Sequence, residues 1–231
     1  MPLVKEKKLV YRFLSKGHAL DFLQTGQLRV GRLRELNDPL DCEPVFVDLD
    51  GKIVNAESDE SLSNILNTIG IVCYSGGVTD PVLWTHYADA HRGIALGFEF
   101  DGNAGLFDVG YRDERPTLNI AVLEQLKKRG EGEGDALLKL ISDGFAVKAK
   151  SWKYEDEYRH FIYLHFGVTM IGPNYFRKVA AHQLKRVVLG VRCELTVFDA
   201  RQAVKKLLRN SRGSVEIIKA SKDPRSFLIR A

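Results

Sequence analysis

The sequence contains little cysteine and no long apolar run, and each shortage excludes a class of protein. The three cysteines, Cys42, Cys73 and Cys193, are an odd number, lie far apart and form no C-x-x-C spacing. This pattern argues against a disulfide framework or a zinc ribbon and favours a reducing cytoplasm. The longest uncharged run, 161–176, contains a histidine, two glycines and a proline, and is shorter than the roughly 20 apolar residues of a membrane span. We therefore expect a soluble, cytoplasmic protein with no membrane partner.

Common motifs for phosphate and metal binding are missing as well. The glycine-rich stretch 130–134, G-E-G-E-G, lacks the lysine and the serine or threonine of a P-loop, and its glutamates would repel phosphate. His86 and His91 are five residues apart, whereas two zinc ligands on one helix are three or four apart. The acidic turn at Asp38 and Asp41 could bind a hard cation, but most such turns are solvated. We predict no metal site.

The charge is unevenly distributed along the chain. The whole sequence has 34 Lys and Arg against 30 Asp and Glu. From Arg177 onward there are 14 basic against 4 acidic residues, a net of +10, which leaves 20 against 26, or −6, for the rest. A basic segment could bind nucleic acid, but it could equally well contact the acidic remainder of the protein.

The hydrophobic pattern predicts one α+β domain over residues 1–231. Residues 9–14 and 94–100 have the alternation of strands, and Ser15 and Gly26 bracket a helix between their capping signals. The segments 118–129 and 136–149 have helical spacing. We expect a mixed, mainly antiparallel arrangement of short-stranded sheets with peripheral helices.

The run 150–161, K-S-W-K-Y-E-D-E-Y-R-H-F, has the densest set of reactive side chains. Aromatic and β-branched residues after it favour a strand, on which Lys153, Glu155, Glu157 and Arg159 would share one face. Two neighbouring carboxylates compensated by a cation could serve acid/base chemistry. On a helix, however, Glu155 and Arg159 would form an ordinary surface pair.

Four motifs in order resemble a widespread prokaryotic family whose function is unknown. They are an opening Y-K/R-Y/F strand (Tyr11, Arg12, Phe13), an N-D-P turn (Asn37, Asp38, Pro39), a W-x-x-Y-A-D-x-H-x-G helix (Trp84, Tyr87, Ala88, Asp89, His91, Gly93) and a W-x-Y-E-x-E-x-R run (Trp152, Tyr154, Glu155, Glu157, Arg159). The resemblance covers nearly the whole chain but implies no particular activity.

A looser resemblance, to ADP-ribosyltransferases, implies a chemistry. It rests on the opening strand Y-R-F-L-S with its following helix, and on the E-x-E of the central run. It implies an ADP-ribosyltransferase-like fold, NAD as substrate and an acceptor that is a protein or a nucleic acid, as in a bacterial toxin or a phage-defence effector. The residue roles that it implies are catalysis by Glu157, acceptor orientation by Glu155, and NAD binding by Arg12, Tyr11, Tyr74, Ser75, Trp84 and Tyr87.

Two other classes of function stay open. In a non-catalytic binding or structural module, Trp84 and Tyr87 would belong to the core, and Glu155, Glu157 and Arg159 would form an internal ion network. In a metal-dependent nuclease, carboxylates would hold the metal and the basic C-terminal segment would contact phosphates. Its predicted ligands are Asp38, Asp41, Glu155 and Glu157.

Overall fold

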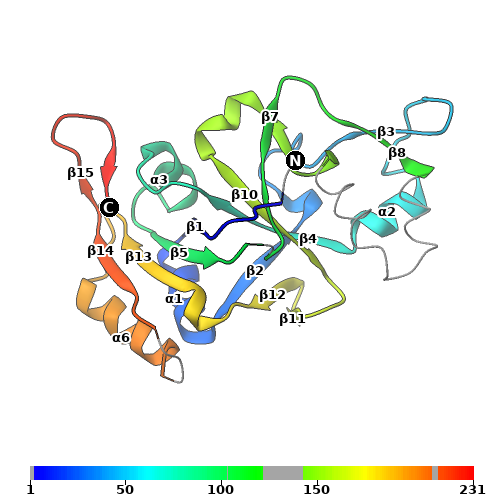
Figure 1. Ribbon diagram of the computed structural model, residues 1–231. Helices are drawn as coiled ribbons and strands as arrows, with labels where there is room; N and C mark the ends of the chain where they lie inside the picture. Colours follow the sequence, from blue (N-terminus) through cyan, green and yellow to red (C-terminus); the bar gives the residue numbers. More distant parts are fainter. Residues whose placement is uncertain (1–2, 103, 122–142, 210–212) are drawn as a thin grey trace.

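The protein is a mixed α+β structure organised around one large sheet (Figure 1). The computed structural model describes residues 3–102, 104–121, 143–209 and 213–231. The sheet runs in the order β11 (Thr169–Ile171), β12 (Asn174–Lys178), β2 (Gln27–Arg32), β4 (Ile69–Ser75), β1 (Lys8–Leu14), β5 (Ile94–Phe100), β13 (Leu184–Leu189) and β14 (Glu216–Lys219), and β10 (Glu157–Tyr163) pairs with both β4 and β6 (Leu106–Asp108). All of these pairs are antiparallel except β13 with β14. The predicted fold class is confirmed, whereas the number of domains stays a prediction.

Three two-stranded ribbons and several short helices complete the described structure. The ribbons pair β3 (Val45–Val47) with β8 (Thr117–Asn119), β7 (Gly110–Arg112) with β9 (Val147–Ala149), and β15 (Ser221–Lys222) with β16 (Ile229–Arg230). The helices are α1 (Lys16–Thr25), α2 (Glu60–Leu66), α3 (Pro81–Tyr87) and α6 (Val197–Leu207), with 3-10 turns η1 (Leu33–Glu35), η2 (Lys150–Glu155) and η3 (Ala181–Gln183). In the described part of the chain, every helix is too short or too polar to cross a membrane.

Helices cover both faces of the main sheet, because its strands alternate apolar side chains between two faces. On β5, Leu96 packs with α1 and α6, while Ala95 packs with α3. On β1, Val10 and Tyr11 divide in the same way. Figure 1 shows α1 and α6 together on one side of the sheet and α3 on the other. The central strands are therefore buried on both faces.

Local signals in the sequence fix several boundaries correctly. The Ser15 side chain accepts a hydrogen bond from the His18 backbone N–H, and Gly26 ends α1 in the left-handed region at a φ of 70°. Asp80 caps α3 in the same manner, and Pro81 occupies the first helical position.

The two helices predicted over 118–129 and 136–149 are wrong at the outer ends that the structure describes, whereas residues 120–121 and 143–144 are helical as predicted. Residues 117–119 form β8 and residues 147–149 form β9, each in a parallel pair. Both strands are fixed by partners distant in sequence, which local propensity does not reveal. Most of the remainder, 122–142, lies outside the described residues.

The turn after α3 explains the glycine of the motif W-x-x-Y-A-D-x-H-x-G. Asp89, Ala90 and His91 all have positive φ, between 48° and 70°, so the chain reverses tightly before β5. Gly93 then donates its N–H to the Ala88 carbonyl at 2.7 Å. A Cβ on Gly93 would lie 2.1 Å from the Leu14 carbonyl oxygen and 2.8 Å from that of Ala88. Only glycine fits this contact between α3 and β1.

Gly93→Ala is therefore expected to lower the free energy of unfolding by about 1 to 3 kcal/mol, as overpacking against fixed backbone does. The measurement is urea unfolding followed by circular dichroism. Gly77→Ala is the matched control, because a Cβ there has no atom within 4 Å. Equal stability of the two variants would contradict the close contact.

Candidate functional site

A pocket opens where the main sheet separates between β1 and β4. These strands, each seven residues long, pair only at Tyr11 and Ser75, whereas β1 and β5 pair at seven positions. Beyond that pair, the Arg12 side chain bridges the separated strands, and its NH1 donates to the Cys73 carbonyl at 2.6 Å. The separation exposes backbone and side chains of both strands to a common space.

The pocket has a volume of about 310 Å³. This lies at the lower end of the range for small-molecule sites. Its walls come from β1, β2, β4, η1 and the loop after it, α3, β9 and the junction of η2 with β10. The charged and polar side chains that line it are Arg12, Arg29, Glu35, Asn37, Asp41, Lys148, Glu155, Glu157, Tyr11, Ser75 and Tyr87.

A buried ion cluster forms one side of this pocket. The Lys148 ammonium lies 2.5 Å from a Glu155 oxygen, 3.0 Å from Glu157 and 3.3 Å from Asp41. All four side chains are at most 5% exposed. Since buried charges are tolerated only when paired, Lys148 is what allows three carboxylates to lie together here.

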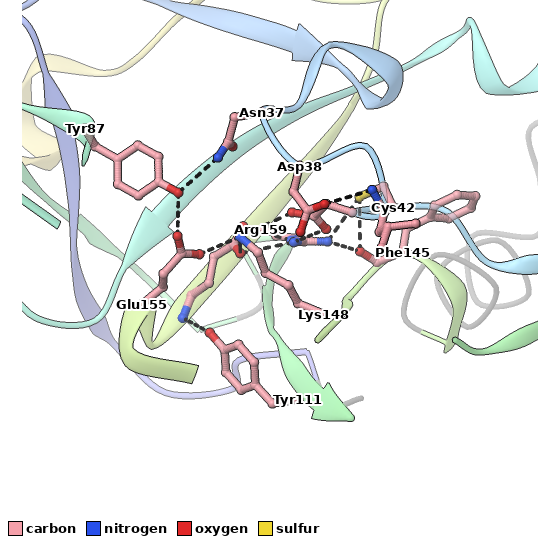
Figure 2. Close-up of polar contacts among 12 residues, drawn as sticks. Asn37, Asp38, Cys42, Tyr87, Tyr111, Phe145, Lys148, Glu155 and Arg159 are labelled. Carbon is pink, nitrogen blue, oxygen red and sulfur yellow. Dashed lines mark hydrogen bonds and ion pairs between the residues drawn. The ribbon is translucent and has the colours of Figure 1, made fainter. Parts of the chain in front are cut away.

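Arg159 completes the cluster but does not line the pocket itself. Its side chain is fully buried and binds Glu157 through Nε and NH2, at 2.9 and 3.0 Å. The same NH2 donates to Asp41 at 2.7 Å, and NH1 donates to the Phe145 carbonyl at 2.5 Å. Figure 2 shows these contacts converging on the guanidinium. Three carboxylates thus face two cations in the cluster.

The two glutamates lie on either side of a turn and do not belong to one continuous strand. Residues 150–155 form η2, and β10 begins only at Glu157, so the predicted strand is wrong in its first half. Between them, Asp156 adopts a left-handed conformation with φ 45°, and its carbonyl accepts a hydrogen bond from the Gly76 N–H at 2.7 Å. Lys148 and Arg159 are the cations that compensate the glutamates, whereas Lys153 is exposed.

Tyr87 connects α3 to the cluster. Its hydroxyl donates to Glu155 at 2.5 Å and accepts from the Asn37 amide at 3.4 Å (Figure 2). The helix that carries Tyr87 is positioned by Trp84, which is fully buried and donates its indole N–H to the Val78 carbonyl. A chain of polar contacts therefore runs from the N-D-P turn across the pocket to Glu155.

One part of the chain matches a known protein family. Residues 83–160 match the family model described as "Protein of unknown function (DUF2971)". The chain contains a DUF2971 domain. The matched range extends from α3 to β10 and includes Tyr87, Lys148, Glu155, Glu157 and Arg159. The predicted family landmarks at Tyr11–Phe13 and Asn37–Pro39 lie outside it. No curated protein and no solved structure matches the chain. The ADP-ribosyltransferase resemblance stays a prediction.

The ion cluster shifts the pKa values of its two glutamates in opposite directions. Burial would raise the pKa of Glu157, but Arg159 and Lys148 outweigh it and lower that pKa to about 2. Burial also raises the pKa of Glu155, and here the neighbouring Glu157 charge adds to it against the opposing effect of Lys148. Glu157 is therefore a fixed negative charge, while Glu155 is the carboxyl group that exchanges a proton more readily.

Acid is expected to remove the contribution of Glu157 to stability. The folded pKa of about 2 lies below the ordinary 4.5, so the unfolded state binds more protons between these values. The free energy of unfolding should fall by about 2 to 4 kcal/mol as pH drops from 4.5 to 2. Urea unfolding at intervals of half a pH unit measures this loss. Repeating it in 0.5 M salt screens exposed ion pairs, so a loss that disappears in salt would contradict the assignment to Glu157.

Seven of the eight predicted site residues line the same pocket. They are Tyr11, Arg12, Tyr74, Ser75, Tyr87, Glu155 and Glu157. The Tyr74 ring itself packs edge-on against Phe98 and Phe100 in the core. The prediction for Trp84 is wrong: it is fully buried, packs edge-on against Phe13 and does not line the pocket, because its side of α3 faces the sheet. The roles of the other seven residues stay predictions.

Sequence reasoning missed Lys148 and misjudged Asp41. Lys148 fell within a predicted helix, where its direction could not be inferred. The sequence predicts Asp41 only as a ligand of a metal ion, whereas in the structure it binds Lys148 and Arg159. Within the described residues, no group of three or more histidines, cysteines or carboxylates could hold a metal ion. The Lys148 ammonium occupies the space between the three carboxylates.

Several basic residues of the C-terminal segment form ion pairs within the protein. Arg186 contacts Glu216 at 2.5 Å, Arg230 contacts Asp223 at 2.6 Å and Lys185 contacts Glu99 at 3.5 Å. Along α6, by contrast, Arg201 and Lys205 have no carboxylate within 4 Å among the residues that the structure describes. Nucleic-acid binding by this segment stays a prediction.

Proposed function

We propose that this protein binds NAD in this pocket and breaks the bond between nicotinamide and ribose, in the manner of an ADP-ribosyltransferase. The observation that carries the proposal is the pairing of three strands. Tyr11 on β1 and Glu157 on β10 both pair with Ser75 on β4, so Arg12, Ser75 and Glu157 reach one pocket from adjacent strands. These are the three positions that the resemblance assigns to NAD binding and catalysis.

Arg12 supplies a cation for the diphosphate. In the described structure its only polar contact is the Cys73 carbonyl, and no carboxylate lies within 4 Å of its guanidinium. Arg29 lines the same pocket and is held at 3.6 Å from Glu35. A planar guanidinium with unused donors suits phosphate oxygens better than an ammonium does.

The two carboxyl groups supply complementary roles. When the bond from C1′ of the ribose to nicotinamide breaks, its electron pair leaves with nicotinamide and C1′ becomes positive. The permanent charge of Glu157 stabilises that cation. An oxygen or nitrogen of the acceptor, or water, then attacks C1′ and gives its proton to Glu155. Burial raises the pKa of Glu155 above its ordinary value, which makes its carboxylate a stronger base than an exposed glutamate.

The size of the pocket fits this assignment. A space of about 310 Å³ holds the nicotinamide and its ribose, and the adenosine half would extend outward past Arg12 and Arg29. Tyr87 lines the pocket and is partly exposed, so its ring can contact the nicotinamide.

One observation favours a second candidate, a non-catalytic binding module. Both oxygens of Glu157 already accept hydrogen bonds from Arg159, and one of them also accepts from Lys148. A carboxylate so fully paired can hold β9, β10 and the Asp41 loop together without any chemistry. In that case the pocket would bind a ligand and leave it unchanged.

Incubation with NAD labelled in the nicotinamide ring separates the two functions. An enzyme should release labelled nicotinamide, and Arg12→Gln should abolish most of that release. Arg201→Gln, on the exposed side of α6, is the matched control and should keep the wild-type rate. Saturable NAD binding without release would favour the binding module, and absence of both would reject the proposal.

A further inference from the structure

A second pocket lies on the other face of β4. Along this strand, Ile71 and Cys73 line the first pocket, whereas Val72 and the Tyr74 ring belong to the opposite face. The second pocket has a volume of about 230 Å³ and lies among β2, β4, β10, β12 and η3. At about 30 Å³ per water molecule, it has room for roughly eight water-sized groups.

The rim of this pocket is cationic. Arg177 and Lys178 of β12 line it together with His160 and Gln183. Arg177 NH1 lies 3.3 Å from His160 Nε2. Because a guanidinium can only donate, Nε2 must be the unprotonated nitrogen, and the imidazole is neutral. Burial and the charge of Arg177 also lower the pKa of His160, to about 4.

These cations have no partner of opposite charge. No carboxylate lines the pocket, and within the described ranges none lies within 4 Å of Arg177 or Lys178. A partly buried guanidinium whose only polar contact is a neutral imidazole is poorly compensated. An anion at the rim would supply the missing charge.

The floor of the pocket is apolar. Leu28, Val72, Phe100 and Ile162 line it and are all buried. Such a floor favours a hydrocarbon body and gives little to a free inorganic ion, which would lose its hydration without gaining contacts. The Tyr74 side chain also lines the pocket.

We propose that this pocket is a second ligand site, for a small organic anion with an apolar body. The charged end, a carboxylate or a phosphate monoester, binds Arg177 and Lys178. The body packs on the floor beneath His160, beside the Phe100 ring that already contacts this imidazole edge-on at 5.9 Å. The site is separate from the NAD pocket and does not depend on its proposed activity.

Binding of benzoate and phenyl phosphate tests the proposal, with benzyl alcohol as the uncharged counterpart. Isothermal titration calorimetry gives the affinity, and the ring signals of His160 in NMR give the location. We expect saturable binding of at least one anion below about 1 mM, weakened at least tenfold by Arg177→Gln, and no saturation by the alcohol. Comparing the two anions shows which charged end is preferred.

Arg201→Gln is the matched control, because Arg201 is exposed on α6 and lines neither of these two pockets, and it should leave anion binding unchanged. Loss of binding in Arg12→Gln but not in Arg177→Gln would place the anion in the first pocket and overturn the proposal. Absence of saturable binding by the wild type up to 10 mM of either anion would overturn it as well. Arg12 and Arg177 are partly exposed, and circular dichroism checks that each variant is folded.

Discussion

Arg159→Met is expected to destabilise the protein by about 3 to 5 kcal/mol, the largest loss from any single change in the site. The side chain is fully buried and contacts two carboxylates and a backbone carbonyl. Methionine fills most of the volume but leaves Glu157 and Asp41 with Lys148 as their only cation. Breaking a buried ion pair from one side leaves an uncompensated charge, which costs more than the pair itself contributes.

Urea unfolding of the variant measures this loss. Arg201→Met is the control, because Arg201 is exposed on α6, and its stability should change by no more than about 0.5 kcal/mol. The double variant Glu157→Gln with Arg159→Met should recover part of the loss, since it removes one of the orphaned charges. An Arg159→Met protein within about 1 kcal/mol of wild type would show that the cluster does not hold these elements together.

The sequence predicts the elements that local chemistry determines. The caps of α1 and the alternation in β5 depend on residues within a few positions of one another, and these predictions are confirmed. The roles that the ADP-ribosyltransferase resemblance implies for Arg12, Tyr87 and Glu157 require them to share one site. All three line one pocket, although no local signal in the sequence brings them together.

The ion cluster could not be derived in this way. Asp41 and Arg159 are 118 residues apart and meet only because β4 and β10 pair while the loop after η1 folds back over them. Lys148 reaches the cluster because β9 pairs with β7, which local propensity misjudged as helix. Trp84 shows a different kind of error. Its position in the motif indicates a binding role, but its side chain belongs to the core.

The structure also changes which glutamate can test catalysis. Glu157→Gln would leave Arg159 and Lys148 short of one negative charge in a buried site, so a loss of stability is expected whether or not Glu157 is catalytic. Lost activity in that variant would therefore be ambiguous. Glu155 lies at the pocket end of the cluster, bound to Lys148 and to the Tyr87 hydroxyl. In Glu155→Gln the amide oxygen can still accept from Lys148, while the amide NH2 can donate to the Tyr87 hydroxyl.

Glu155→Gln is accordingly expected to lower transfer of ADP-ribose from NAD by about 10² to 10⁴, the usual effect of losing a general base. Its loss of stability should be smaller than that of Arg159→Met. In the wild type, the rate should rise as pH increases through the raised pKa of Glu155, because only the ionised carboxyl accepts a proton. This rise of the rate with pH should be missing from Glu155→Gln.

Tyr87→Phe removes one hydrogen bond to Glu155 but keeps the carboxyl group, so it should keep the rise of the rate with pH at a lower overall rate. A Glu155→Gln protein with the wild-type rate and pH profile would remove the base from the mechanism and leave the pocket as a site that only binds.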